Sequence, residues 1–189
     1  MRAEGSDLAA FVSGSYAKAY RTACLIVRNP ADAEEAVQEA FLRAWRFRAS
    51  VKEGRPLEPW LYRVLMNACY SKLRSTARQR TDEELPDDVV AAGGDPFDRA
   101  GDAELGAVVR SALAALPEPL RAPVVLRYFA GLSEKEIAVA IGRLVSPPLR
   151  SDSLAASRRP GTVKSRLHEA RRLLAGDERL AQFAAEVAQ

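Results

Sequence analysis

The chain has 189 residues, of which 48% are apolar and 28% charged, and its formal net charge is +3. This composition is typical of a soluble protein that forms hydrophobic cores. No apolar run approaches the roughly 18 residues that cross a membrane, and no basic-then-apolar leader stands at the start. We therefore expect a cytoplasmic protein, with neither membrane insertion nor secretion.

The charge is distributed unevenly along the chain. Residues 43–80 hold ten basic and two acidic residues, a net of +8, and residues 81–104 hold nine acidic and one basic, a net of −8. Residues 105–189 hold thirteen basic and eight acidic residues, a net of +5. Two basic blocks separated by an acidic segment predict two modules and a linker. A basic block favours nucleic acid or an anionic membrane surface as the partner.

The sequence gives no sign of catalysis or of a metal site. Cys24 and Cys69 lack CxxC spacing, so we interpret both as small buried hydrophobes in a reducing compartment. No acid pair, nucleophile with a base, or cluster of metal ligands accompanies the single histidine, His168. We therefore expect no enzymatic activity and no cofactor or metal, and His168 is interpreted as a contact to phosphate or water.

The first half predicts three helices. Apolar residues recur at i, i+3, i+4 spacing in the first helix, where they form its packing side: Leu8, Phe11, Val12, Tyr16, Ala19, Tyr20, Ala23 and Val27. Asn29 and Pro30 then suit the cap and the first position of a new helix. We place Trp45 in the core. The buried stripe of this second helix is Ala33, Ala36, Val37, Ala40, Phe41 and Ala44. Its other side mixes acidic, polar and apolar residues, which suits a protein partner better than DNA, although a solvated face is the alternative.

Residues 48–58 read as a loop, and Pro59 is predicted to begin a long helix through Arg80. When the residues are projected around this helix at 100° per residue, a group of cations, an amide and an aromatic falls within an arc of about 80°. That set is Arg63, Asn67, Tyr70, Arg74 and Arg78, and the opposite set is Leu61, Leu65, Ala68 and Cys69. Cations for phosphate and an aromatic for stacking suit single-stranded DNA. Trp60 either packs in the core, which we favour, or stacks near bases.

The second half predicts a helix from residue 105, a break at "LPEP", and a helix over 118–130 that Pro123 kinks. Ser133 and Glu136 form a capping box for a further helix through Ile141. The last predicted helix, "GTVKSRLHEARRLL" (161–174), has a packing stripe of Val163, Leu167, Ala170 and Leu174. Its outward side is polar and cationic. A capped helix followed by a second helix is the order of a helix-turn-helix, and a solvated amphipathic helix is the alternative.

These segments resemble extracytoplasmic-function (ECF) sigma factors of bacteria. "LPEPLRAPVVLRYFAGLSEKEIAVAIG" with "GTVKSRLHEARRLL" resembles region four, which binds the minus-thirty-five element and the polymerase beta flap. "DAEEAVQEAFLRAW" (32–45) resembles the core-binding helix of region two, and "PWLYRVLMNACYSKLRSTARQR" (59–80) resembles the segment that opens and reads the minus-ten element. The resemblance implies as partners the core enzyme through its beta-prime clamp helices and beta flap, promoter DNA, and an anti-sigma factor.

The resemblance also implies three sets of site residues. For core binding they are Asp32, Glu35, Gln38, Glu39 and Leu42. For the minus-ten element they are Lys52, Arg55, Trp60, Arg63, Asn67, Tyr70, Arg74 and Arg78, where the loop around Lys52 and Arg55 captures a flipped base unless these two are plain solvated charges. For the minus-thirty-five element they are Thr162, Lys164, Ser165, Arg166, His168, Arg171 and Arg172.

The expected architecture is therefore all-α, with two small helical domains. Residues 1–80 form sigma region 2, 81–104 a flexible acidic linker, and 105–189 a region 4 helix-turn-helix. The segment 143–160 departs from the family, because some eighteen residues stand where about three are expected. It reads as a long inserted loop that leaves the two helices able to dock but no longer fixes their crossing angle.

The predicted function is that of an ECF-type alternative sigma factor, which directs core polymerase to promoters and promotes minus-ten melting. A free-standing helix-turn-helix regulator is one alternative, since "GLSEKEIA" and "GTVKSRL" also resemble LuxR-type output domains. It leaves residues 32–45 and the basic helix unexplained. The other alternative is an adapter that binds polymerase or an anti-sigma factor but reads DNA poorly because of the insert.

Overall fold

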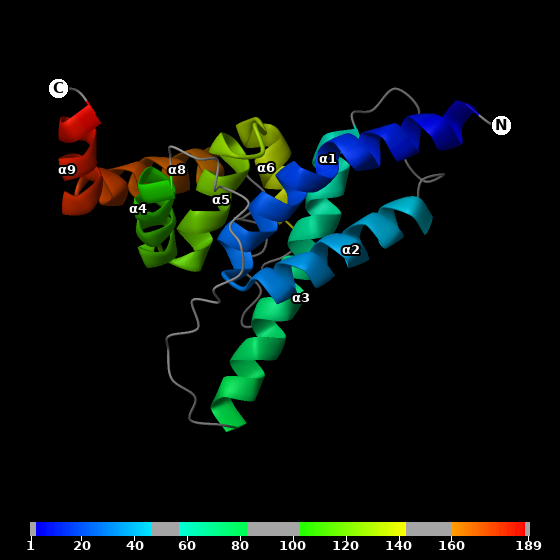
Figure 1. Ribbon diagram of the computed structural model, residues 1–189, viewed down its shortest axis with the longest axis horizontal. Coiled ribbons are helices and arrows are strands. Elements are labelled where there is room, and N and C mark those ends of the chain that lie inside the picture. Colours follow the sequence, from blue (N-terminus) through cyan, green and yellow to red (C-terminus); the bar gives the residue numbers. More distant parts are fainter. Residues whose placement is uncertain (1–2, 47–56, 83–102, 143–159, 188–189) are drawn as a thin grey trace. The chain divides into compact units, whose positions relative to one another are not determined.

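The computed structural model of the protein describes residues 3–46, 57–82, 103–142 and 160–187, and every regular element in these segments is an α-helix. The predicted all-α class is confirmed (Figure 1). Contacts divide the chain into two compact units, Met1–Ala91 and Ala92–Gln189. Residues 143–159 of the predicted insert at 143–160, and residues 83–102 of the predicted linker, lie outside the described segments. Pro160, the last residue of the predicted insert, begins a helix.

The first unit contains three long helices, α1 (Ala3–Val27), α2 (Pro30–Arg46) and α3 (Leu57–Asp82). A tight connection joins α1 to α2: Arg28 adopts a left-handed φ of 61°, and its N–H donates to the Cys24 carbonyl over 2.9 Å. That is the usual way to close a helix C-terminus. The Asn29 side chain then accepts from the N–H groups of Ala31 and Asp32, so the predicted cap is confirmed.

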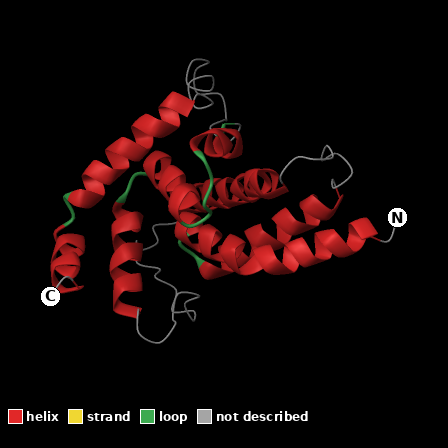
Figure 2. Cartoon of the chain, turned by 90° about the horizontal axis from the view of Figure 1, so that it is seen from above, coloured by secondary structure: helices red, strands yellow, loops and turns green. Residues whose placement is uncertain are grey.

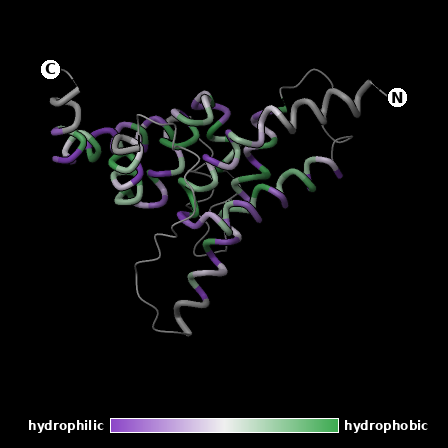
Figure 3. Tube along the Cα trace, in the orientation of Figure 1, coloured by the Kyte–Doolittle hydropathy of each residue, from purple (hydrophilic) through white to green (hydrophobic). Residues whose placement is uncertain are grey.

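Small residues of α2 let the three helices approach closely. The buried residues of α2 are Ala33, Ala36, Val37, Ala40 and Ala44. Helix α2 packs against α3, whose large buried side chains include Leu61, Leu65 and Met66, each at most 1% exposed. Figure 3 shows apolar and polar residues alternating along the helices, as expected when one face of each helix packs against its neighbours.

Three predicted core positions lie at the edge of this core instead. Tyr16 is 40% exposed and stacks on Phe41, which is partly exposed, with ring centroids 5.9 Å apart. Cys24 is also partly exposed, whereas Cys69 is buried as predicted. Phe41 lies at the side of the buried stripe of α2, about 40° beyond Val37.

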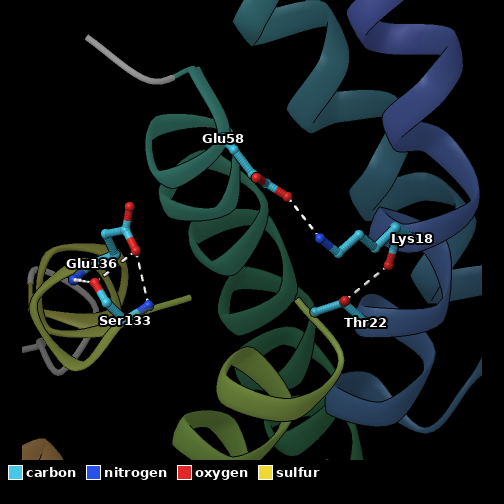
Figure 4. A network of polar contacts seen from close by, with 5 residues as sticks. All are labelled: Lys18, Thr22, Glu58, Ser133 and Glu136. Carbon is cyan, nitrogen blue, oxygen red and sulfur yellow. Dashed lines mark hydrogen bonds and ion pairs between the residues drawn. The ribbon is translucent and has the colours of Figure 1, made fainter. Parts of the chain in front are cut away.

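Helix α3 begins at Leu57, two residues earlier than predicted, and continues to Asp82, two residues into the predicted linker. Pro59 does not start the helix but lies in its first turn, where its missing N–H has no intrahelical partner to lose. The first turn is fastened to α1 by an ion pair, Lys18 Nζ to Glu58 Oε1 at 2.8 Å (Figure 4).

The second unit contains α4 (Ala103–Ala115), α5 (Glu118–Tyr128), α6 (Glu134–Ile141), α8 (Pro160–Ala175) and α9 (Glu178–Val187). Figure 2 shows only helices and loops among the described segments of the chain. Helices α5, α6 and α8 pack on one another. Their shared core includes Val125, Leu126, Ile137, Val163 and Leu167, each at most 1% exposed.

Helix α5 ends at Tyr128, two residues earlier than predicted, and a turn leads from it to α6. Gly131 has a left-handed φ of 73°, and the N–H of Leu132 returns to the Leu126 carbonyl at 3.0 Å, which closes α5. Ser133 and Glu136 form the predicted capping box (Figure 4). These hydrogen bonds from Ser133 lower the pKa of Glu136. Pro123 lies inside α5 without ending it.

Two features of the second unit were not predicted. Arg121 of α5 is 7% exposed and donates to the carbonyls of Leu113, Ala114 and Leu116 over 2.8–3.0 Å. It therefore satisfies the open C-terminal end of α4. The other feature is α9, whose N-terminus is capped by Asp177 through the N–H groups of Arg179 and Leu180.

Candidate nucleic-acid interface

The predicted single-strand stripe lies on the exposed side of α3. The residues predicted to face the core, Leu61, Leu65, Ala68 and Cys69, are each at most 1% exposed. At 100° per residue, the stripe is centred about 160° away from them. Arg63, Asn67, Tyr70 and Arg74 are partly exposed and Arg78 is exposed. Helix α3 therefore brings these five candidate residues together on one side.

Trp60 belongs with this stripe more than with the core. It is partly exposed, and it lies at the same angular position on α3 as Arg78. The preference for core packing is thus only partly right. The other two candidate minus-ten residues, Lys52 and Arg55, lie outside the described segments.

The candidate core-binding residues share one side of α2. Glu35, Gln38 and Leu42 are exposed, Leu42 by 59%, while Asp32 and Glu39 are partly exposed. Trp45 joins this surface: it is 45% exposed, so its predicted place in the core is wrong. The physical reason is angular, because seven residues make nearly two turns and Trp45 lies about 20° from Gln38. The surface therefore combines acidic groups with two large apolar side chains.

Basic residues partly compensate these acids. Lys72 of α3 forms an ion pair with Glu35, and Arg43 Nη2 lies 2.5 Å from Glu39 Oε1. The pKa of Lys72 is raised, chiefly by its hydrogen bond to Glu35, with smaller contributions from Asp32 and Glu39. The sequence prediction missed this contact. The sequence did contain a signal for it: by helical spacing Lys72 lies on the same side of α3 as Leu61, Leu65 and Ala68, which is the side that packs against other helices.

In the second unit, α8 packs largely as predicted. Val163, Leu167 and Ala170 are at most 1% exposed, and Leu174 is partly exposed. Of the candidate residues, Lys164, Ser165, His168, Arg171 and Arg172 are exposed, and Thr162 and Arg166 are partly exposed. Helix α6 packs directly against α8. The two helices of the predicted helix-turn-helix are thus in contact, with polar and cationic side chains on the outer side of α8.

Arg171 is held by a residue that the sequence prediction missed. Its Nε donates to the Tyr128 hydroxyl over 2.9 Å, and its guanidinium carbon lies 6.0 Å from the centroid of the Tyr128 ring. Tyr128 ends α5 and is 58% exposed. No periodicity identifies such a contact, because the two residues are 43 positions apart.

Within the described segments, no group of three or more His, Cys, Asp or Glu side chains could hold a metal ion. Among the helices of those same segments, none is both long and apolar enough to cross a membrane.

Comparisons with known families match both units. The profile of sigma-70 region 2 matches residues 12–79, and the profile of sigma-70 region 4 matches residues 107–146. The second match covers most of α4 and all of α5 and α6, but it ends before α8 begins at Pro160.

Several curated proteins are similar over most of the chain. The ECF RNA polymerase sigma factor SigE of Mycolicibacterium smegmatis is 35% identical over 177 residues, which cover 91% of this chain and 61% of that protein. SigM of Mycobacterium tuberculosis is 31% identical and SigW of Bacillus subtilis 28% identical. Those alignments cover 92% and 83% of this chain, and 84% and 81% of the relatives. The chain thus spans less than two thirds of the SigE relative.

A solved structure shares the fold. The sigma factor RpoE of Bartonella quintana, determined in complex with the anti-sigma factor NepR, matches with a TM-score of 0.69 and 24% identity. The match covers 92% of this chain and 95% of that one.

Proposed function

The chain belongs to the ECF family of RNA polymerase sigma factors, and from this premise we propose that it directs bacterial core polymerase to specific promoters and opens their minus-ten element. It acts as a non-enzymatic specificity subunit in the cytoplasm. The observation that carries this proposal is the position of the α3 stripe. Helix α3 carries cations, an amide and aromatics on its outer side, and its other side packs against α2. Helix α2 in turn presents the mixed acidic and apolar surface that suits a protein partner.

The first unit docks on core polymerase through α2. Exposed Leu42 and Trp45 supply apolar area, while Glu35 and Glu39 supply charge complementarity to a basic partner surface. By family membership this partner surface is the pair of beta-prime clamp helices. Acidic groups at this place keep α2 away from DNA, so docking and DNA contact use different sides of the unit.

Helix α3 then holds the melted strand. Arg63, Arg74 and Arg78 contact phosphates, Tyr70 and Trp60 offer aromatic faces to unpaired bases, and Asn67 offers an amide to a base edge. Because bases stack on aromatic side chains only after they leave the duplex, these contacts favour the open strand over the closed one. Stabilising the open strand is how the stripe promotes melting without hydrolysing a nucleotide.

The second unit grips the minus-thirty-five duplex and the beta flap. Thr162 and Ser165 stand at the N-terminal part of α8, which in a helix-turn-helix faces base edges. Lys164, Arg166, Arg171 and Arg172 contact phosphates, and His168 contacts a phosphate or water. Tethering both units on one polymerase raises the effective concentration of each for its promoter element. We also propose an anti-sigma factor as a partner, since RpoE was crystallised with one.

Reconstitution with core polymerase tests the function. The full chain is mixed with purified core enzyme and a genomic promoter library, and transcript starts are mapped by run-off transcription. We expect co-elution with core and a defined set of start sites that are absent with core alone. Failure to bind core would contradict the proposal and favour a free-standing regulator. Tight core binding without defined start sites would favour the adapter.

A further inference from the structure

Tyr128 is an unusually placed aromatic residue. It is the last residue of α5 and is 58% exposed, yet both parts of its side chain are engaged by one arginine. The hydroxyl oxygen accepts from Arg171 Nε at 2.9 Å, and the ring lies 6.0 Å from the guanidinium carbon. These two contacts restrict the position and the plane of the guanidinium group.

The contact lies beside the candidate DNA side of α8. At 100° per residue, Arg171 lies about 20° from Lys164 and about 60° from His168. The three residues therefore form a row along one flank of α8, and all three are exposed. Tyr128 borders this row from a different helix. Residues that flank a recognition helix contact phosphates rather than bases in helix-turn-helix proteins.

The chemistry of the pair suits a phosphate. An arginine has five N–H donors, and Tyr128 accepts from the one on Nε. The two terminal nitrogens belong to the opposite end of the planar group, where they match the oxygens of a phosphate. The tyrosine hydroxyl can also donate its own hydrogen to an anionic oxygen. Because the guanidinium is already held, less side-chain freedom is lost when it binds.

We propose that Tyr128 is a positioning residue for DNA: it holds Arg171 so that the guanidinium contacts a backbone phosphate beside the minus-thirty-five element. The inference rests on the proposed function of the second unit and adds a residue of α5 to its DNA surface. The contact is independent of base sequence, so it raises affinity and fixes orientation without changing which promoters are read.

Tyr128→Phe tests the inference because it removes the hydroxyl and keeps the ring. Holoenzyme made from the full chain is titrated with a fluorescein-labelled duplex from a promoter found by run-off transcription, over a range of KCl concentrations. We expect Arg171→Ala to weaken binding about tenfold and to reduce the slope of log K against log salt by about one. Tyr128→Phe should weaken binding about threefold, and less in the Arg171→Ala background. Tyr16→Phe, at an exposed tyrosine of the first unit, is the matched control and should change nothing.

The outcomes separate the inference from the proposed function. If wild-type holoenzyme selects no promoter in the run-off assay, the proposed function fails. If it binds promoter DNA but Tyr128→Phe matches wild type, the inference is overturned. It is also overturned if Tyr128→Phe only lowers the melting temperature measured by circular dichroism, because the contact then merely fastens α5 to α8. Independent, additive effects of Tyr128→Phe and Arg171→Ala contradict it as well.

Discussion

Burial controls the ionisation of single side chains in the first unit. Cys69 is 0% exposed, and desolvation raises the pKa of its thiol from an ordinary value of 9.0 to about 12. The pKa of Tyr62, which is 2% exposed, rises to about 12 for the same reason, although a hydrogen bond with Thr22 opposes the rise. Both side chains are therefore neutral wherever the protein is folded under ordinary conditions.

The raised pKa of Cys69 predicts a loss of stability in alkali. The folded state favours the neutral thiol, so its contribution is complete below about pH 9, where the unfolded chain is also neutral, and it is lost between pH 9 and pH 12. We expect the free energy of unfolding in urea to fall by roughly 2 kcal/mol between pH 8 and pH 10.5 from this residue alone. Tyr62 adds to the fall above about pH 10.

Cys69→Ala is the control for this pH dependence. The variant has a lower stability at pH 8 because it leaves a small cavity, but the fall between pH 8 and pH 10.5 should be shallower than in wild type. Equal slopes for the two proteins would show that Cys69 does not ionise on unfolding in this range, and would contradict the prediction.

Long-range contacts limited what the sequence could predict for single residues. Arginine is ordinarily a surface residue, so Arg121 gave no sign of being buried. It is buried because three carbonyls need donors: those of Leu113 and Ala114 in the last turn of α4 and that of Leu116 just after the helix. These residues lie five to eight positions before Arg121. The prediction for Trp45 was wrong in the opposite direction. Its size suggested that it is buried in the core, but its angular position on α2 places it on the exposed side.

At the scale of helices, the contact between Lys72 and Glu35 links the proposed core-binding helix to the proposed DNA-binding helix. The two side chains are 28% and 63% exposed. Water therefore screens much of their attraction, and an exposed pair of this kind contributes about 0.2–1 kcal/mol. A double-mutant cycle of Lys72→Ala and Glu35→Ala, measured by urea unfolding, should give a coupling energy in this range that falls in 1 M salt.

Arg43 and Glu39 provide the matched comparison, since both residues belong to α2 and lie one turn apart. Their coupling should be about 0.3–0.5 kcal/mol. A coupling of zero between Lys72 and Glu35, or one that salt does not change, would show that their ion pair does not help to hold α2 against α3.

Helices with local signals were predictable, and those without them were not. The cap at Asn29 and the box at Ser133 and Glu136 depend on neighbouring residues, so the sequence sufficed. The start of α3 at Leu57 was missed because Pro59 suggested a later first position. Helix α9 was missed although Gly176 and Asp177 resemble a stop followed by a cap, since its short amphipathic pattern follows a longer helix directly.

At the scale of the whole molecule, the two proposed DNA-binding helices belong to basic parts of the sequence that an acidic segment separates. The basic blocks contain α3 and α8, and the acidic segment 81–104 stands between them in the sequence. The sequence predicted both candidate DNA surfaces because helical periodicity decides which residues share a face. It did not predict Tyr128 as a neighbour of α8, or Lys72 as a neighbour of the candidate core-binding surface of α2, because tertiary packing brings each residue there from another helix.

The stripe on α3 is the central element of the proposed mechanism, and permanganate footprinting of the minus-ten thymines tests it most directly. Holoenzyme carrying Arg63→Ala, Asn67→Ala and Arg74→Ala is compared with wild type and with Lys135→Ala, an exposed cation of α6, after co-elution with core is shown to be equal. The account predicts that reactivity falls at least tenfold, by an order-of-magnitude estimate, in the α3 variant alone. Wild-type reactivity in that variant would contradict it.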